Sequence, residues 1–186
     1  DAANNYGNKG TFTLDVTEIA AAPSTLHLQE LGVGNIDYVT LKNTGTAPVQ
    51  LRGVQVFIPS QTSYGTDIRV DLPTQTLAAG ATLTIVDGSA QPGEITVSNL
   101  PWTETSDFSV QLCFGACSET DGSNVIDAAL FGTAATALPT GVGFSGGPVS
   151  GIAPAQVDTH AYVRNATAGA HPTFLASDWT VGASTR

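Results

Sequence analysis

Short runs in which apolar and polar side chains alternate recur along this 186-residue sequence. A period of two is typical of β-strands with one buried face, and helical periodicity is nearly absent. The clearest run covers residues 108–114, where Phe108, Val110, Leu112 and Phe114 share one face. Further runs occupy residues 11–16, 39–42, 49–51, 54–58, 68–72, 83–86, 95–97, 125–130, 162–164 and 174–181. The alternation predicts an all-β chain.

Turn residues separate these runs and keep them short. Pro59 and Pro73 each follow a run, and proline removes a backbone donor that the interior of a sheet needs. The sequences Asn43-Thr44-Gly45 and Asp121-Gly122 suit tight turns, because Asn, Asp and Gly tolerate left-handed backbone angles. About eight or more short antiparallel strands at this spacing favour a two-sheet β-sandwich.

The length of the chain suits one well-buried domain. We expect this domain over residues 11–182, after a flexible polar arm at residues 1–10 and before a short tail at residues 183–186. Residues 133–157 are rich in Gly, Ala, Pro and Thr, and their glycines are spaced too irregularly for a strand, so a long surface loop is expected there. No stretch approaches the roughly 18 apolar residues of a spanning helix, so direct membrane insertion is not expected.

The charge balance restricts the partners. Sixteen Asp and Glu stand against six Lys and Arg, a net charge of -10. Such a surface repels phosphate backbones and anionic lipids, so nucleic acid is not expected as a partner. The chain starts at Asp1 and contains no Met, as after removal of a signal peptide, and we expect a secreted protein, extracellular or at the cell surface.

The two cysteines, Cys113 and Cys117, lie close together in the sequence. In an exported protein such a pair is expected to form a disulfide, and closing so short a loop stabilises by only about 2 kcal/mol. A zinc site would need His27, His160 or His171 in addition, and none of them has the paired spacing of zinc ligands. A structural disulfide is the prediction.

Several segments, in this order, resemble the lamin-tail domain of secreted bacterial proteins. The most specific is residues 37–53, in which Asn43-Thr44-Gly45 is followed by a Val-x-Leu-x-Gly pattern. One departure is Val54, where many relatives have a Trp after the Gly. The resemblance implies an immunoglobulin-like sandwich and a non-catalytic module for display, attachment or assembly outside the cell. Its other carriers are residues 16–19, 77–85, 110–112 and 125–127.

One motif points to catalysis instead. Residues 143–147 match the G-x-S-x-G pattern around Ser145, and Asp158 and His160 follow in the order of α/β-hydrolases. That motif needs a strand-to-helix elbow, and nothing after Gly147 suggests a helix. Asp158 and His160 lie two residues apart, so on a strand their side chains would lie side by side on one face. This placement is awkward for a carboxylate that must orient the imidazole from behind. We do not expect an enzyme, and a hydrolase using Ser145 is the remote alternative.

Two binding functions are further alternatives. Glu119, Asp121 and Asn124 offer oxygen ligands for calcium, although their spacing is not that of an EF-hand and the same residues suit a plain turn.

Aromatic side chains suggest the second alternative binding function, which is polysaccharide binding. Trp102, Tyr6 and Tyr64 lie among polar or loop residues and could stack on a polysaccharide. Trp179, near the end of the chain, is expected to be buried and to fill part of the core.

The leading expectation is a non-catalytic extracellular structural, adhesive or assembly module, with protein partners or self-association. Exposed sheet edges offer unpaired backbone groups to a neighbouring chain. The alternation from Thr11 to Thr17 suits such strand exchange, and an ordinary first strand of the sandwich explains it equally well. The alternative is a calcium- or polysaccharide-binding accessory module.

Overall fold

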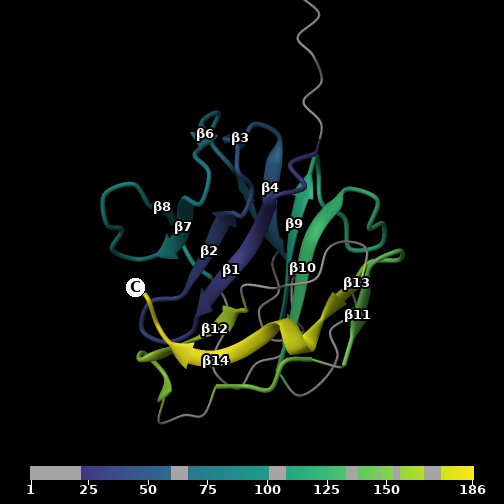
Figure 1. The fold of residues 1–186 in the computed structure, drawn as a ribbon. Coiled ribbons are helices and arrows are strands. Elements are labelled where there is room, and N and C mark those ends of the chain that lie inside the picture. Colours follow the sequence, from purple (N-terminus) through teal and green to yellow (C-terminus); the bar gives the residue numbers. More distant parts are fainter. Residues whose placement is uncertain are drawn as a thin grey trace, which may run out of the picture.

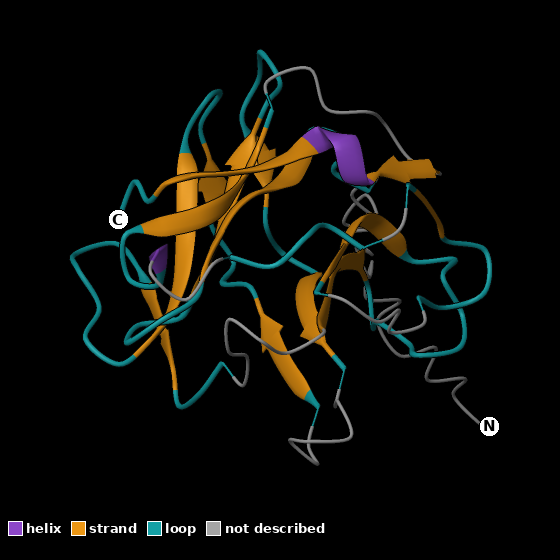
Figure 2. Cartoon of the chain, turned by 90° about the horizontal axis from the view of Figure 1, so that it is seen from below, coloured by secondary structure: helices purple, strands orange, loops and turns teal. Residues whose placement is uncertain are grey.

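The structure, a computed structural model, describes residues 22–59, 67–100, 108–132, 138–146, 148–152, 156–165 and 173–186. These residues are almost entirely strands and loops, with a single-turn 3-10 helix at Ala176–Asp178, so the all-β prediction is confirmed (Figures 1 and 2). Among them no helix is long and apolar enough to cross a membrane. The strands are β1 Leu26–Gly32, β2 Tyr38–Asn43, β3 Val49–Gln50, β4 Val54–Ile58, β5 Ile68–Asp71, β6 Thr76–Leu77, β7 Thr82–Asp87, β8 Ile95–Val97, β9 Phe108–Phe114, β10 Val125–Phe131, β11 Gly143–Ser145, β12 His160–Arg164, β13 Thr173–Leu175 and β14 Trp179–Ala183.

Two sheets form the sandwich. The larger has six strands in the order β14-β12-β1-β2-β7-β8, and the smaller has four in the order β10-β9-β4-β5. Every pairing within them is antiparallel except that of β7 with β8. Two small sheets complete the fold, an antiparallel pair of β3 with β6 and a parallel pair of β11 with β13. The predicted β-sandwich is confirmed, with two parallel pairs that the sequence did not suggest.

The core lies between the two main sheets and holds a cluster of aromatic rings. The ring centroids of Phe131 and Tyr162 are 4.4 Å apart, and Trp179 meets Phe131 edge to face at 5.1 Å. Phe108 stacks on Phe131 at 5.0 Å. Trp179 is only 4 % exposed, so its expected burial in the core is confirmed. Because Tyr162 and Trp179 belong to the last strands, the end of the chain completes the core.

A central strand of the larger sheet, β1, was not among the predicted strands. Its register against β2 shifts between Leu28 and Glu30, the mark of a β-bulge. The shift places Leu26 and Leu28 on one phase of the alternation and Leu31 on the other, and all three are fully buried. A strict period of two therefore does not detect this strand.

Two predicted boundaries need correction. The surface loop expected at residues 133–157 contains β11, whose partner β13 lies far along the chain and supplies the pairing that the local sequence does not reveal. The tail expected at residues 183–186 is bound to the larger sheet: Ala183 belongs to β14, and Thr185 bonds to Glu30. The arm at residues 1–10 and the first predicted strand at 11–16 lie outside the described residues.

Candidate functional site: the free edge of the six-stranded sheet

Strand β14 forms one edge of the larger sheet and lies beside β12 at the margin of the molecule (Figure 1). Hydrogen bonds at both ends of the pairing between β12 and β14 show which residues of β14 direct their backbone groups toward β12. The Ser184 N–H donates to the Thr159 carbonyl at 3.0 Å, and the Asn165 N–H donates to the Asp178 carbonyl at 2.7 Å. In antiparallel pairs, hydrogen-bonded positions alternate with non-bonded ones. The backbone groups of β14 therefore divide into two sets.

Thr180 and Gly182 direct their backbone groups toward β12, and Val181 and Ala183 direct theirs away from the sheet. No hydrogen bond joins the outward N–H and C=O groups of Val181 and Ala183 to another strand among the described residues. The side chain of Val181 packs partly against the core, and that of Ala183 is exposed. Within the part of the chain that the structure describes, the outer side of β14 thus offers a row of donors and acceptors without partners, beside a partly apolar face.

The two edges of the smaller sheet are closed in different ways. On β10, the Val149 N–H bonds to the Leu130 carbonyl at 2.9 Å, and the Gly132 N–H bonds to the Val149 carbonyl at 2.9 Å. Strand β5 carries the charged side chains of Arg69 and Asp71 on its exposed positions. Charged side chains and covering segments are usual protections of a sheet edge against pairing with another chain.

The opposite edge of the larger sheet, β8, is only three residues long. Short edge strands offer little to pair with. In contrast, β14 runs from Trp179 to Ala183 without a charged residue or a proline. Among the four described edge strands of the two main sheets, β14 is the one that lacks a protecting feature.

A buried carboxylate anchors the chain just beyond β14. Glu30 is 2 % exposed and accepts hydrogen bonds from the Tyr38 hydroxyl, from the Thr185 N–H at 2.8 Å and from the Thr185 hydroxyl. Ser184 lies 2.6 Å from the same Tyr38 oxygen. Burial, and secondly the bond to Glu30, raise the pKa of Tyr38 well above its ordinary value. This network fixes the end of β14 against β1 and β2.

The last residue is held by an ion pair. The Arg186 guanidinium contacts both carboxylate oxygens of Glu94, at 2.9 and 3.0 Å, and also the Ser89 carbonyl at 2.8 Å. The hydrogen bond from Arg186 lowers the pKa of Glu94 below its ordinary value. The segment after β14 is thereby docked on the outer face of the sheet, and β14 itself has a defined position.

A polar groove of about 410 Å³ crosses the outer face of the larger sheet. Much of its lining is already bonded within the protein: Thr40 and Thr84 share a hydrogen bond of 3.0 Å, and Glu94 is paired with Arg186. The groove has few groups left to bind a ligand, although it shows that this face is rich in threonine. Its lining residues are Gln29, Glu30, Thr40, Lys42, Thr82, Thr84, Gln91, Glu94, Val163, Thr185 and Arg186.

The residues of the proposed hydrolase are not brought together. Asp158 and His160 line a cavity of about 160 Å³ whose lining does not include Ser145. Both carboxylate oxygens of Asp158 accept hydrogen bonds from Asn35, and the ring of His160 bonds to Thr159. Ser145 is exposed on β11, and no α-helix follows it among the described residues. The strand-to-helix elbow that the G-x-S-x-G motif requires is absent from the described part of the chain.

The loop suggested for calcium is organised by turn hydrogen bonds. Asp121 Oδ1 accepts from the Ser123 N–H at 2.9 Å, and Asn124 Nδ2 donates to the Ala116 carbonyl at 3.0 Å. Glu119 is exposed. Nowhere in the described ranges does a group of three or more His, Cys, Asp and Glu side chains meet so as to hold a metal ion.

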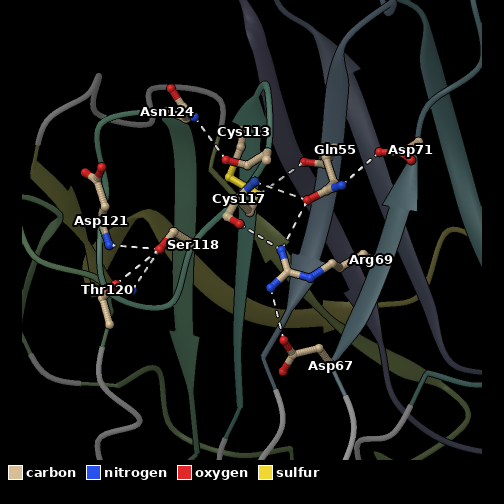
Figure 3. The surroundings of a disulfide bond; sticks show 11 residues. Gln55, Asp67, Arg69, Asp71, Cys113, Cys117, Ser118, Thr120, Asp121 and Asn124 are labelled. Atoms are coloured by element: carbon tan, nitrogen blue, oxygen red, sulfur yellow. Dashed lines mark hydrogen bonds and ion pairs between the residues drawn. A yellow bond between two sulfur atoms is a disulfide. The ribbon is translucent and has the colours of Figure 1, made fainter.

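Cys113 and Cys117 are joined by a disulfide, as their spacing predicted. Figure 3 shows the loop that it closes fastened to two strands of the smaller sheet. Arg69 on β5 donates to the Cys117 carbonyl at 2.7 Å, and Gln55 on β4 accepts from the Cys117 N–H at 3.1 Å. The bridge therefore orders a loop that lies against the outer face of that sheet.

A buried ion pair connects the two main sheets, and the sequence did not reveal it. Asp127 on β10 is 0 % exposed and accepts two hydrogen bonds from the guanidinium of Arg164 on β12. The Leu28 N–H of β1 donates to the same carboxylate at 2.8 Å, and Arg164 donates to the Leu28 carbonyl at 3.2 Å. His27 lies 3.6 Å from Asp127. This cluster joins β1, β10 and β12.

The aromatic residues suggested for polysaccharide binding, Tyr6, Tyr64 and Trp102, lie outside the described residues.

Comparison with known proteins leaves the family open. No family model matches the chain, and no curated protein matches it. Among solved structures, it is similar to Pseudomonas fluorescens alkylpurine DNA glycosylase AlkC bound to DNA containing an abasic site analog, at 22% identity and a TM-score of 0.27. The match covers 50% of this chain and 27% of that chain, so this chain corresponds to a minor part of that protein's length. A likeness at this TM-score carries no argument about fold or function.

Proposed function

We propose that this chain is a non-catalytic, extracellular structural module that assembles by accepting a strand from a partner at the free edge of β14. The observation that carries the proposal is the outward row of backbone groups at Val181 and Ala183, which have no strand partner among the described residues and lie on an edge with no charge and no proline. Each strand hydrogen bond contributes about 0.5–1.5 kcal/mol, and an added strand makes several together.

The contrast between edges supports this function. Charged side chains, bridging segments and short length protect β5, β10 and β8, as expected of a sheet that must not pair with other chains. No described segment pairs with the outer side of β14, while Glu30 and Glu94 hold its end in a fixed position. A rigid and unprotected edge is suited to accept a strand.

The compartment and the charge fit the same role. A disulfide is characteristic of oxidising environments outside the cytosol. The net charge of -10 disfavours broad contacts between copies, so attraction is confined to an uncharged element such as β14. The lamin-tail resemblance implies the same class of module, used for display, attachment or assembly.

A substitution at Ala183 tests the proposal. Ala183→Pro removes an outward N–H while leaving the bonds to β12 intact, because proline is tolerated on an edge where its nitrogen faces solvent. Ala183→Ser keeps the N–H and is the matched control. By sedimentation velocity over a wide concentration range, we expect the Ser variant to assemble like the unsubstituted chain and the Pro variant to require at least about tenfold higher concentration, equivalent to about 1.4 kcal/mol.

Thermal unfolding of both variants verifies that the sandwich is preserved. A chain that stays monomeric at every concentration, with no extended peptide bound to β14, would overturn the proposal, as would equal assembly of the Pro and Ser variants.

A further inference from the structure

We propose that the strand accepted by β14 is residues 11–17 of a second copy of this chain. The inference rests on the proposed function and names its partner. Residues 11–17 precede residue 22 and lie outside the described part of the chain. Their sequence is Thr-Phe-Thr-Leu-Asp-Val-Thr, in which apolar and polar side chains alternate without interruption.

The two faces of this segment match the two faces of β14. On β14, Trp179 and Val181 point toward the core, and Thr180 points to the outer face. A strand added alongside continues both faces, because neighbouring strands in a sheet share them. Phe12, Leu14 and Val16 of the segment would then extend the apolar side.

The polar positions of the segment match the outer face of the sheet equally well. That face carries Thr40, Thr82 and Thr84 in the groove beside the central strands. The segment presents Thr11, Thr13, Asp15 and Thr17 on its polar side. Cross-strand threonines suit a solvated sheet face, and a shift of the segment by one residue would place its apolar side chains in water. The alternation therefore allows only registers that differ by an even number of residues.

Charge also favours a slender segment over a broad surface. Two copies that each carry a net charge of -10 repel one another when large areas approach. Residues 11–17 contain a single charge, Asp15, on the side that faces water. A strand of this composition joins the uncharged edge of β14 without bringing the acidic surfaces into contact.

Variants of the segment test this assignment in the full chain. Leu14→Asp places a charge on the face that would contact the core side of the sheet, and Thr13→Asp places the same charge on the solvated face as the matched control. By sedimentation velocity, we expect Leu14→Asp to weaken assembly at least about tenfold and Thr13→Asp to weaken it less than about threefold. A synthetic peptide of residues 9–19 is expected to dissociate assemblies, and a scrambled peptide is not.

A mixing experiment identifies the direction of the exchange. Leu14→Asp has a defective donor and an intact edge, whereas Ala183→Pro has an intact donor and a defective edge. At a concentration at which the unsubstituted chain assembles and each variant alone remains monomeric, a mixture of the two variants is expected to give one-to-one heterodimers that grow no further. Mass photometry of the mixture measures this product.

The outcomes separate this inference from the proposed function. If Ala183→Pro disrupts assembly and Leu14→Asp does not, the edge is the acceptor but residues 11–17 are not the donor, and the inference fails alone. If neither variant changes assembly, the proposed function fails as well. If the chain is monomeric and the 9–19 peptide binds only after Leu14→Asp frees the edge, the segment pairs within its own chain and the exchange between copies is refuted.

Discussion

Two polar side chains of β9 show how a single residue can reduce stability. Ser109 and Gln111 are fully buried, and among the described residues neither the Ser109 hydroxyl nor either amide atom of Gln111 has a hydrogen-bond partner. They lie on the face of β9 that also carries Cys113, under a small apolar cluster that includes Phe57 and Phe174. A buried polar group without a partner costs about 1–3 kcal/mol.

Replacing Gln111 by a residue of similar shape should relieve this cost. We expect Gln111→Met to raise the free energy of unfolding by about 1–2 kcal/mol, measured from the urea midpoint at constant slope. Gln55→Met on the neighbouring strand is the control, because the Gln55 amide is bonded to Asp71 at 2.8 Å, and it should not be stabilising. A loss of stability in Gln111→Met would mean that a bound water satisfies the amide.

Tyr38 makes the stability sensitive to alkaline pH. Its pKa in the folded state is raised above the ordinary value of 10.0 by burial and by the bond to Glu30. The protonated phenol is therefore favoured by folding, so its contribution is complete below pH 10 and is lost as the pH rises through the folded pKa. We expect the unfolding free energy to fall above pH 10, with a smaller slope in Tyr38→Phe, as measured by urea unfolding at a series of pH values. Equal slopes would contradict this account.

Among the elements, those with an uninterrupted alternation could be predicted from the sequence. Strand β9 alternates from Phe108 to Leu112, and β7 alternates as far as Ile85. Both strands were predicted within a residue or so of their observed bounds. Strand β1 was missed because its bulge changes the phase of burial, and β11 because its partner β13 is remote in sequence. The free edge of β14 could not be predicted, since the local sequence does not say which strands end up at the margins of a sheet.

The ion pair of Asp127 and Arg164 connects three elements, and its loss should be costly. Removing one partner leaves a buried charge without compensation, which typically costs about 3–5 kcal/mol. We expect Asp127→Asn to lower the unfolding free energy by about this amount in urea unfolding. The double variant Asp127→Leu with Arg164→Met should lose less, because it removes both charges. A cost under about 1 kcal/mol for Asp127→Asn would show that the pair is not needed to join the sheets.

In the whole molecule, the predicted sandwich and the buried Trp179 agree with the structure, and the groups that define the candidate site arise from long-range topology. Cys113 and Cys117 are separated by four positions in the sequence, so their disulfide could be predicted from this spacing alone. Asp127 and Arg164 meet over a separation of 37 residues, and no local pattern marks them as partners. Composition and periodicity indicate what kind of layers form, but they do not specify which residues meet across them.

The pairing between β1 and β12 is short, and this has a mechanical consequence. In a filament joined as proposed, tension would enter each subunit where the chain leads into β1 and leave it at β14, passing in shear through β12. Strand β1 pairs with β12 only from Glu30 to Gly32, whereas β12 pairs with β14 along its whole length. The bond from Arg164 to the Leu28 carbonyl extends the shorter ladder, and Asp127 holds that guanidinium in place. The carboxylate of Asp127 would thereby raise the force that such a filament withstands before its subunits unfold.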